Sequence, residues 1–256
     1  MSQHLHICPI LIHPKLPGVI FANFKPALNQ FATYFSRNNG KTFEKMKYDS
    51  NNDGCVDNLC DAKLHLPCYI KPNVFCTKEW IITMAGENKN SELDRTQYFV
   101  TFNAGSIWKK VPFSKFAVKT MNGGGIIVGL NLHTNKVVYS FDEGKTYSRL
   151  SIYDDDEIII EAAKIGIAEN ERLVIYGRDS NRSTLIITHY VLKYTDRTCV
   201  STDYSPWSLV RSKGNCYQGK SIVYMKKNID SMCMDNQTNT IKISTPCLCN
   251  LNDFHW

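Results

Sequence analysis

One short pattern of residues occurs three times and constrains the fold of this 256-residue chain more than any other feature. It reads Ser-x-Asp/Asn-x-Gly-x-Thr-aromatic at 36–43 and 140–147, with a degenerate copy at 101–108. Each copy follows a stretch rich in β-branched and aromatic residues and leads into another apolar run, which indicates a turn between two strands. The defining residues are Ser36, Asn38, Gly40, Thr42 and Phe43, then Thr101, Asn103, Gly105 and Trp108, then Ser140, Asp142, Gly144, Thr146 and Tyr147.

The pattern resembles the Asp-box, in which every defining residue has a structural role. The Asp or Asn side chain is expected to accept hydrogen bonds from backbone N–H groups two residues further on, which closes an Asx-type turn. Glycine takes the backbone conformation with positive φ, and the Ser or Thr adds a second local hydrogen bond. With the terminal aromatic packed into the sheet, each box predicts a hairpin between antiparallel strands.

The spacing of the boxes predicts propeller blades. From Thr101 to Ser140 is 39 residues, close to the ~40–45 residues of one four-stranded blade. From Ser36 to Thr101 is 65 residues, which leaves an insertion of roughly 20–25 residues beside one blade. We therefore expect an all-β partial propeller of three to four blades, with a cysteine-bearing loop between two of them. The stretch at 157–168 has helix-favouring alanines, but its three consecutive isoleucines favour a buried strand.

The ten cysteines are clustered. Four lie between residues 55 and 76, five lie in the last quarter, and Cys8 stands alone. Disulfide-bonded modules use cysteine in this way, so we expect an oxidising compartment. Two glycosylation triplets, which begin at Asn181 and Asn236, agree with that expectation.

The N-terminus does not fit a luminal chain. The first 15 residues have no basic start and no small-residue cleavage site, so we predict no signal peptide here. No apolar run approaches the ~18 residues of a membrane span. A luminal composition without an entry signal indicates a truncated reading frame. The net charge is +6 with scattered lysines, so no nucleic-acid partner is expected.

These features together resemble one family, the sortilin-type (vacuolar protein sorting receptor) luminal domain, in its C-terminal part. The matching stretches are KLPGVIFANF at 15–24, Cys55 and Cys60 followed by AKLHL at 62–66, GGGIIVGL at 123–130 and YSFDEGKTY at 139–147. The tail is more specific, with Cys199, Asp203-Tyr204, Trp207, Gly214 to Gly219, Cys233, Cys247-Leu-Cys249 and Asp253-Phe254. The resemblance runs from about residue 11 to the end.

The resemblance implies a ten-bladed propeller braced from below by small cysteine-rich modules. Residues 1–195 would then be C-terminal blades, and 196–256 the start of a truncated disulfide-bonded module. The family also implies a type I membrane receptor of the Golgi–endosome system or cell surface, whose luminal part binds peptide or protein ligands. Its transmembrane segment would lie outside this chain. By matching position, the implied disulfides are Cys55–Cys60, Cys199–Cys233 and Cys216–Cys247.

The chain departs from the family pattern in several places. Only three to four of ten blades are expected here. Thr146 stands where some relatives carry a cysteine, and relatives continue with a cysteine near Trp256, so Cys249 lacks its expected partner. The cysteines at 8, 68 and 76 are additional, and Cys68 and Cys76 could pair with each other.

Three sequence features are candidates for metal or phosphate sites. The C-x-C spacing of Cys247 and Cys249 is not that of a zinc knuckle, so disulfides are favoured over zinc. The acidic run at 154–157 lacks the alternating ligands of a calcium loop, which favours a solvated loop. The glycines at 123–125 lack the Lys-Ser/Thr of a phosphate loop, which favours a tight turn. No metal or cofactor is expected.

Three functions are open from the sequence. The first is a ligand-binding segment of a sorting or endocytic receptor, and the second is a truncated or degenerate fragment without independent binding. The third is a sialidase-like glycosidase, which needs an arginine cluster, a Tyr–Glu nucleophile pair and an acidic proton donor. Because Arg172, Arg178 and Arg182 crowd one expected hairpin, we predict that the chain is not an enzyme.

Overall fold

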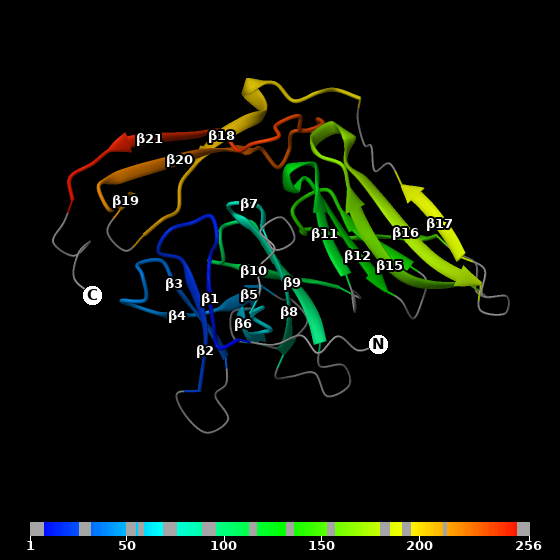
Figure 1. The fold of residues 1–256 in the computed structure, drawn as a ribbon, viewed down its shortest axis with the longest axis horizontal. Coiled ribbons are helices and arrows are strands. Elements are labelled where there is room, and N and C mark those ends of the chain that lie inside the picture. Colours follow the sequence, from blue (N-terminus) through cyan, green and yellow to red (C-terminus); the bar gives the residue numbers. More distant parts are fainter. Residues whose placement is uncertain are drawn as a thin grey trace.

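The computed structural model describes twelve stretches of the chain: 8–25, 32–49, 55, 59–68, 76–88, 96–112, 117–131, 136–152, 157–179, 185–190, 196–211 and 214–249. Within these stretches the regular structure is β-strand, apart from three short 3-10 turns. The strands form several separate sheets (Figure 1). The prediction of an all-β chain with propeller-like sheets is therefore confirmed.

The first and third sheets are four-stranded antiparallel meanders, which we call the first and third blades. The first blade contains β1 (Ile10–Ile12), β2 (Ile20–Phe24), β3 (Ala32–Ser36) and β4 (Glu44–Lys45). The third contains β11 (Ala117–Met121), β12 (Ile126–Asn131), β13 (Lys136–Ser140) and β14 (Ser148–Ser151). In both, strand order follows chain order, and an Asp-box joins the third strand to the fourth.

The second blade lies in a six-stranded sheet. The sheet contains β5 (Lys47–Asp49), β6 (Leu59–Leu64), β7 (Cys76–Lys78), β8 (Ile81–Asn88), β9 (Thr96–Thr101) and β10 (Trp108–Val111). Its blade is β6-β8-β9-β10, and β5 pairs with both β6 and β10 to close a ring of five strands. The expected cysteine-bearing loop is therefore partly strand, because Cys60 lies in β6, pairs with Tyr48 of β5 and is buried in the core.

The fourth blade has three described strands: β15 (Glu157–Ile165), β16 (Arg172–Asp179) and β17 (Leu185–Tyr190). The strand prediction for 157–168 is confirmed as far as Ile165. The isoleucines differ in burial, because Ile159 is 1% exposed whereas Ile158 is 38% exposed. Successive strand residues point to opposite faces, and only the face of Ile159 packs against the third blade.

The two end blades each have an uncovered face with exposed apolar side chains. On the first blade these are Ile10, Ile12 and Phe24, which lie on one face of β1 and β2. On the fourth blade they include Ile158 of β15 and Leu185 and Ile187 of β17. Within the described stretches no element packs on either face, and we call them the open faces.

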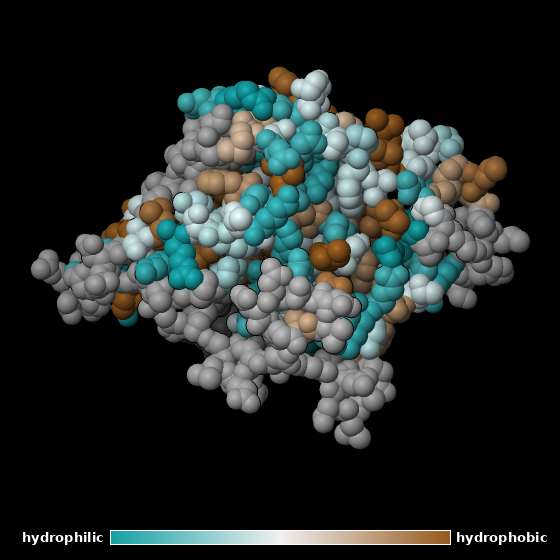
Figure 2. Space-filling view, turned by 180° about the vertical axis from the view of Figure 1, so that it is seen from behind, coloured by the Kyte–Doolittle hydropathy of each residue, from teal (hydrophilic) through white to brown (hydrophobic). Residues whose placement is uncertain are grey.

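Two buried cores hold the blades together. The larger joins the first and second blades, and Val118 and Ile127 of the third, to the C-terminal module. It includes Phe21, Phe99, Trp108 and Tyr224. The smaller lies between the third and fourth blades and includes Val128, Ile159, Leu173 and Ile175. On the outside, Figure 2 shows hydrophobic residues scattered among hydrophilic ones.

The C-terminal module is a small sheet. It contains β18 (Tyr204–Trp207), β19 (Cys216–Tyr217), β20 (Lys220–Lys227) and β21 (Lys242–Pro246). Its strands run along one side of the first and second blades (Figure 1). The predicted boundary at 195/196 falls next to residues 191–195, which lie outside the described stretches.

Candidate functional site: the junction of the blades and the module

The three Asp-box turns have the same hydrogen bonds. In the third box the backbone N–H of Gly144 donates to Ser140 Oγ at 2.9 Å, and that of Thr146 donates to Asp142 Oδ1 at 2.9 Å. The equivalent glycine bonds are Gly40 N–H to Ser36 Oγ and Gly105 N–H to Thr101 Oγ1. The equivalent side-chain acceptors are Asn38 for Thr42 N–H and Asn103 for Ile107 N–H.

The expected two-residue reach of the Asp or Asn side chain is wrong, because these N–H donors lie four residues further on. The reason is the backbone of the turn, which has two consecutive residues with positive φ in each box. They are Asn39-Gly40 (59° and 80°), Ala104-Gly105 (59° and 99°) and Glu143-Gly144 (54° and 76°). The turn is therefore complete before a backbone N–H group reaches the acceptor oxygen of the Asp or Asn side chain.

The box side chains also shape the sheet and the local charge. Trp108 is fully buried and donates from Nε1 to the carbonyl of Gly105, whereas Phe43 and Tyr147 are half-buried. Partial burial acts to raise the pKa of Asp142, but hydrogen bonds from Thr146 and Ser140 outweigh it, so the pKa lies below its usual value. The box carboxylate is thus held ionised by the turn it closes.

The module docks on these same turns. Lys226 of β20 donates to the carbonyl of Phe102 in the second box at 3.1 Å and pairs with Glu143 of the third box at 3.0 Å. At the first box, Arg211 donates to the carbonyl of Arg37, and Arg37 donates to the carbonyl of Val210 at 3.1 Å. The Asp-box turns therefore form the platform on which the module sits.

An aromatic cluster anchors the module beneath this platform. Trp80 of the second blade lies 5.6 Å from Trp207 of β18 and 6.2 Å from Tyr224 of β20, measured between ring centroids. Trp80 and Tyr224 are almost fully buried, and Leu209 belongs to the same core. Burial of these aromatic side chains in one core stabilises the packing of the module on the blades.

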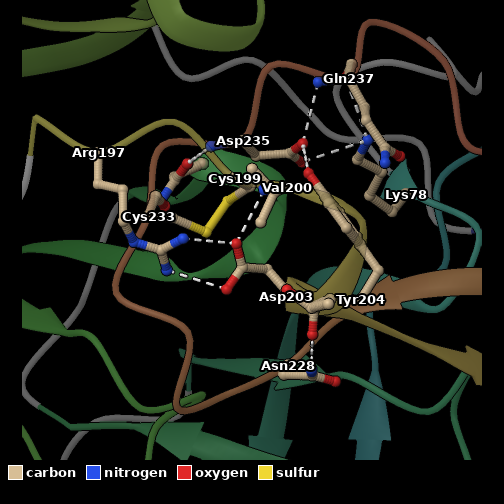
Figure 3. Close-up of a disulfide and its surroundings, with 12 residues drawn as sticks. Lys78, Arg197, Cys199, Val200, Asp203, Tyr204, Asn228, Cys233, Asp235 and Gln237 are labelled. Atoms are coloured by element: carbon tan, nitrogen blue, oxygen red, sulfur yellow. Dashed lines mark hydrogen bonds and ion pairs between the residues drawn. A yellow bond between two sulfur atoms is a disulfide. The ribbon is translucent and has the colours of Figure 1, made fainter.

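A buried carboxylate forms the polar part of the junction. Asp235 accepts a 2.7 Å hydrogen bond from the hydroxyl of Tyr204 and a 3.0 Å bond from the backbone of Gln237 (Figure 3). Its own backbone N–H donates to the side chain of Asn122 in the third blade, and Lys78 lies 3.6 Å away. One module residue therefore touches two blades as well as its own loop.

The glycine run at 123–125 makes room for that carboxylate. A Cβ atom on Gly123 would lie 2.0 Å from Asp235 Oδ2, and Gly123 has φ of 62°. The predicted tight turn is present as a 3-10 turn at Asn122–Gly124 before β12. Its second purpose, close approach of the module, was missed by sequence reasoning, although three consecutive glycines were the signal.

The structure contains the three disulfides that the resemblance implies: Cys55–Cys60, Cys199–Cys233 and Cys216–Cys247. The suggested Cys68–Cys76 pair is wrong, because Cys68 bonds to Cys8. A backbone hydrogen bond from Cys8 to the carbonyl of Leu66 holds the two segments together. Cys249 is free and exposed, and the side chain of Cys76 lies outside the described residues.

An ion pair lies beside the Cys199–Cys233 disulfide. Arg197 donates twice to Asp203, at 2.7 and 2.9 Å, and the backbone of Val200 donates to the same carboxylate (Figure 3). The Arg197 guanidinium holds the pKa of Asp203 well below its usual range. Cys199, Asp203 and Cys233 are the single metal-type cluster within the described residues, but its two sulfurs are bonded to each other.

A polar cavity of about 750 Å³ opens next to this junction. Its walls come from all four blades, from the module loop at 235–240 and from the start of β21. They include Lys15, Lys78, Lys164, Glu171, Asp235 and Lys242. The acidic groups have partners: Lys164 pairs with Glu171 at 2.9 Å, and Thr240 donates to Glu79 at 2.6 Å. The cavity thus offers ammonium, hydroxyl and amide groups to a polar ligand.

Of the remaining predicted sites, some lie within the described residues and others lie outside them. Asn236 is exposed, whereas Asn181, Arg182 and the acidic run at 154–156 lie outside the described residues. No helix in the described part of the chain is long and apolar enough to cross a membrane.

Comparison with known proteins shows that two family models match this chain. Residues 13–162 match the model described as sortilin, neurotensin receptor 3, and residues 167–255 match its C-terminal model. The models change over between 162 and 167, which is earlier than the predicted boundary at 195/196. Since β15 pairs with β16, that change falls inside the fourth blade.

Relatives with sequence similarity are receptors and sorting proteins. The human VPS10 domain-containing receptor SorCS1 is 28% identical over 259 residues, which cover 93% of this chain and 22% of the relative. Vacuolar protein sorting/targeting protein 10 of Colletotrichum graminicola is 24% identical, over 87% of this chain and 16% of its own length. The chain thus spans about a fifth of these relatives. It belongs to the sortilin/Vps10 family of sorting receptors.

Proposed function

We propose that this chain is a luminal ligand-binding segment of a sorting or endocytic receptor that binds peptides or proteins for intracellular trafficking. The observation that carries the proposal is the junction, where the aromatic cluster and Asp235 join the module to the blades. The match to both family segments and the packing of the module on the blades support this proposal. Four disulfides agree with an oxidising lumen.

The cavity at the junction supports a peptide or protein as the ligand. A peptide backbone presents donors and acceptors in alternation, and the cavity wall presents lysines, threonines and partnered carboxylates. The name of the matching family includes a neurotensin receptor, which agrees with a ligand-binding role. The proposal requires no metal, cofactor or nucleic acid, and places membrane attachment in a transmembrane segment elsewhere in the receptor.

A peptide selection tests this proposal. The full chain, purified with its disulfides formed, is presented to a phage-displayed library of random peptides, and the reduced chain serves as the matched control. We expect enriched peptides that bind saturably to the oxidised chain and lose binding on reduction. Equal recovery from both forms would contradict ligand binding by this chain.

The second candidate, a receptor fragment without independent binding, is favoured by one observation. The open faces expose apolar side chains on both end blades, including Ile12 at 65% and Leu185 at 61%. Exposed apolar sheet faces are a hazard for association in solution. Failure of the peptide selection, together with concentration-dependent association in sedimentation velocity, would select this candidate over the first.

The proposal also excludes catalysis. Arg172 and Arg178 lie on the single strand β16, whereas a sialidase-like site gathers arginines from separate blades around its carboxylate substrate. We expect no hydrolysis of a fluorogenic sialoside by the oxidised chain. Turnover above a heat-denatured control would overturn the receptor proposal in favour of a glycosidase.

A further inference from the structure

Asn236 is displayed by a loop that is held on both sides. The loop connects β20 to β21 and contains no strand or helix between residues 228 and 241. Asp235, immediately before, is 3% exposed and bound to Tyr204 and Asn122, while Gln237, immediately after, donates its backbone N–H to Asp235. Asn236 itself is exposed. The amide is therefore presented to solvent from a loop that has a defined conformation.

The triplet Asn236-Gln237-Thr238 has the chemistry of an oligosaccharide acceptor. N-linked glycosylation needs Asn-x-Ser/Thr with no proline at the middle position, on a surface loop of a chain that enters the lumen. Thr238 is exposed as well. The loop thus satisfies the structural requirement as well as the sequence requirement.

The residues that follow Asn236 lead directly into the cavity at the junction. Gln237, Thr238, Asn239 and Thr240 all line it, together with lysines from three blades. The described lining contains no aromatic side chain and is rich in hydroxyl, amide and ammonium groups. Such a wall can exchange hydrogen bonds with the hydroxyl groups of sugars.

We propose that Asn236 carries an N-linked glycan whose first sugars lie along the mouth of this cavity. The proposal rests on the luminal location given under the proposed function. A glycan here would cover the loop side of the cavity and leave the blade side, at Thr120 and Lys164, for the ligand of the proposed function.

Expression of the full chain behind a secretory leader in a eukaryotic cell tests the attachment. We expect a glycosidase specific for N-glycans to shift the electrophoretic mobility, and peptide mapping to show conversion of Asn236 to aspartate. Asn236→Gln and Thr238→Ala lose that step, whereas the matched variant Thr238→Ser keeps it. Peptide mapping reports Asn181 separately. Unmodified Asn236 in secreted protein with all four disulfides formed overturns the proposal.

The position of the sugars is tested by rate. Lying along the cavity, the Asn236 glycan should be released more slowly from folded wild type than from folded Lys242→Ala, whose cavity wall has one donor fewer. Equal rates overturn the contact with the cavity.

The leader places the chain in the lumen whatever its natural route, so an empty Asn236 speaks against the glycan alone. Protease protection of the protein expressed from its natural gene tests the location. Its failure would speak against the proposed function, while the acceptor chemistry of the loop, tested behind the leader, would stand.

Discussion

The first and fourth blades both end the array with an open face, yet they are held in different ways. The inner face of the first blade packs into the core shared with the second blade and the module, where Phe21 lies edge-on to Trp108. Disulfide Cys8–Cys68 joins the segment before β1 to the segment after β6. The fourth blade contributes only to the smaller core, and no described disulfide reaches it.

The module therefore fixes one end of the array more firmly than the other. Arg211 reaches the first blade through the carbonyls of Arg37 and Pro17. The fourth blade meets the third through Glu171, which accepts a 2.6 Å hydrogen bond from the backbone of Asn122. We therefore expect cooperative unfolding of the first two blades with the module, and independent local opening of the fourth blade.

Core truncation gives the largest expected effect. Both Phe21 and Ile175 are fully buried, so Phe21→Ala should cost about 3–5 kcal/mol and Ile175→Ala about 2–5 kcal/mol of unfolding free energy. Hydrogen exchange should show the first loss spread over the first two blades and the module, and the second confined to the fourth blade. Ile187→Ala on the open face is the control, with a change within about 0.5 kcal/mol. Identical exchange patterns for both core variants would contradict the comparison.

Acid should destabilise the first blade by protonating His13. Burial, and then the charge of Lys15, lower the pKa of His13 to about 4 from 6.5. His13 Nδ1 accepts hydrogen bonds from the backbone N–H groups of Lys15 and Leu16. Because the unfolded chain takes up the proton first, stability present above pH 6.5 is lost as the pH falls toward 4, by about 3 kcal/mol.

His13→Asn is the matched variant for this test, since its side-chain oxygen can accept the same bonds and does not titrate. Urea denaturation at several pH values should show wild type losing stability relative to His13→Asn between pH 6.5 and 4. A constant difference across that window would show that the burial of His13 does not couple to acid.

Close approach at the junction gives a smaller effect. Gly123→Ala combines strain at positive φ with a clash against Asp235, whereas Gly214→Ala has positive φ and no atom within 4 Å of the added Cβ. Strain alone costs about 1–3 kcal/mol, so Gly123→Ala should be the more destabilising of the two. Asp235→Ala should reduce that excess in a double-mutant cycle. Equal losses of unfolding free energy for the two glycine variants would show that Asp235 does not lie against Gly123.

Local chemistry made much of the fold predictable, and long-range contacts made the rest unpredictable. The box hairpins could be predicted because Ser140, Asp142 and Gly144 interact within one turn. The Cys8–Cys68 bond could not, because its cysteines are 60 residues apart and no local pattern pairs them. The seat of Asp235 on Gly123 likewise depends on how the module and third blade meet, which neither segment specifies alone.

The smallest expected effect comes from Lys226, the module residue that spans two Asp-box turns. The side chains of Lys226 and Glu143 are each 20% exposed, so solvent screens the pair only partly. Lys226→Met should therefore lower the free energy of unfolding by about 1 kcal/mol. Lys220→Met lies on the exposed start of the same strand and is the control for loss of charge.

The pattern of hydrogen exchange in Lys226→Met tests the comparison more directly than the loss of stability does. Without Lys226, the module keeps its aromatic anchor on the second blade and its first-box contact through Arg211, but loses its tie to Glu143 of the third blade. Hydrogen exchange in Lys226→Met should therefore increase around the third box and leave the first box unchanged. An increase at all three boxes would mean that the module grips the blades as one unit, and the contrast between the two ends of the array would disappear.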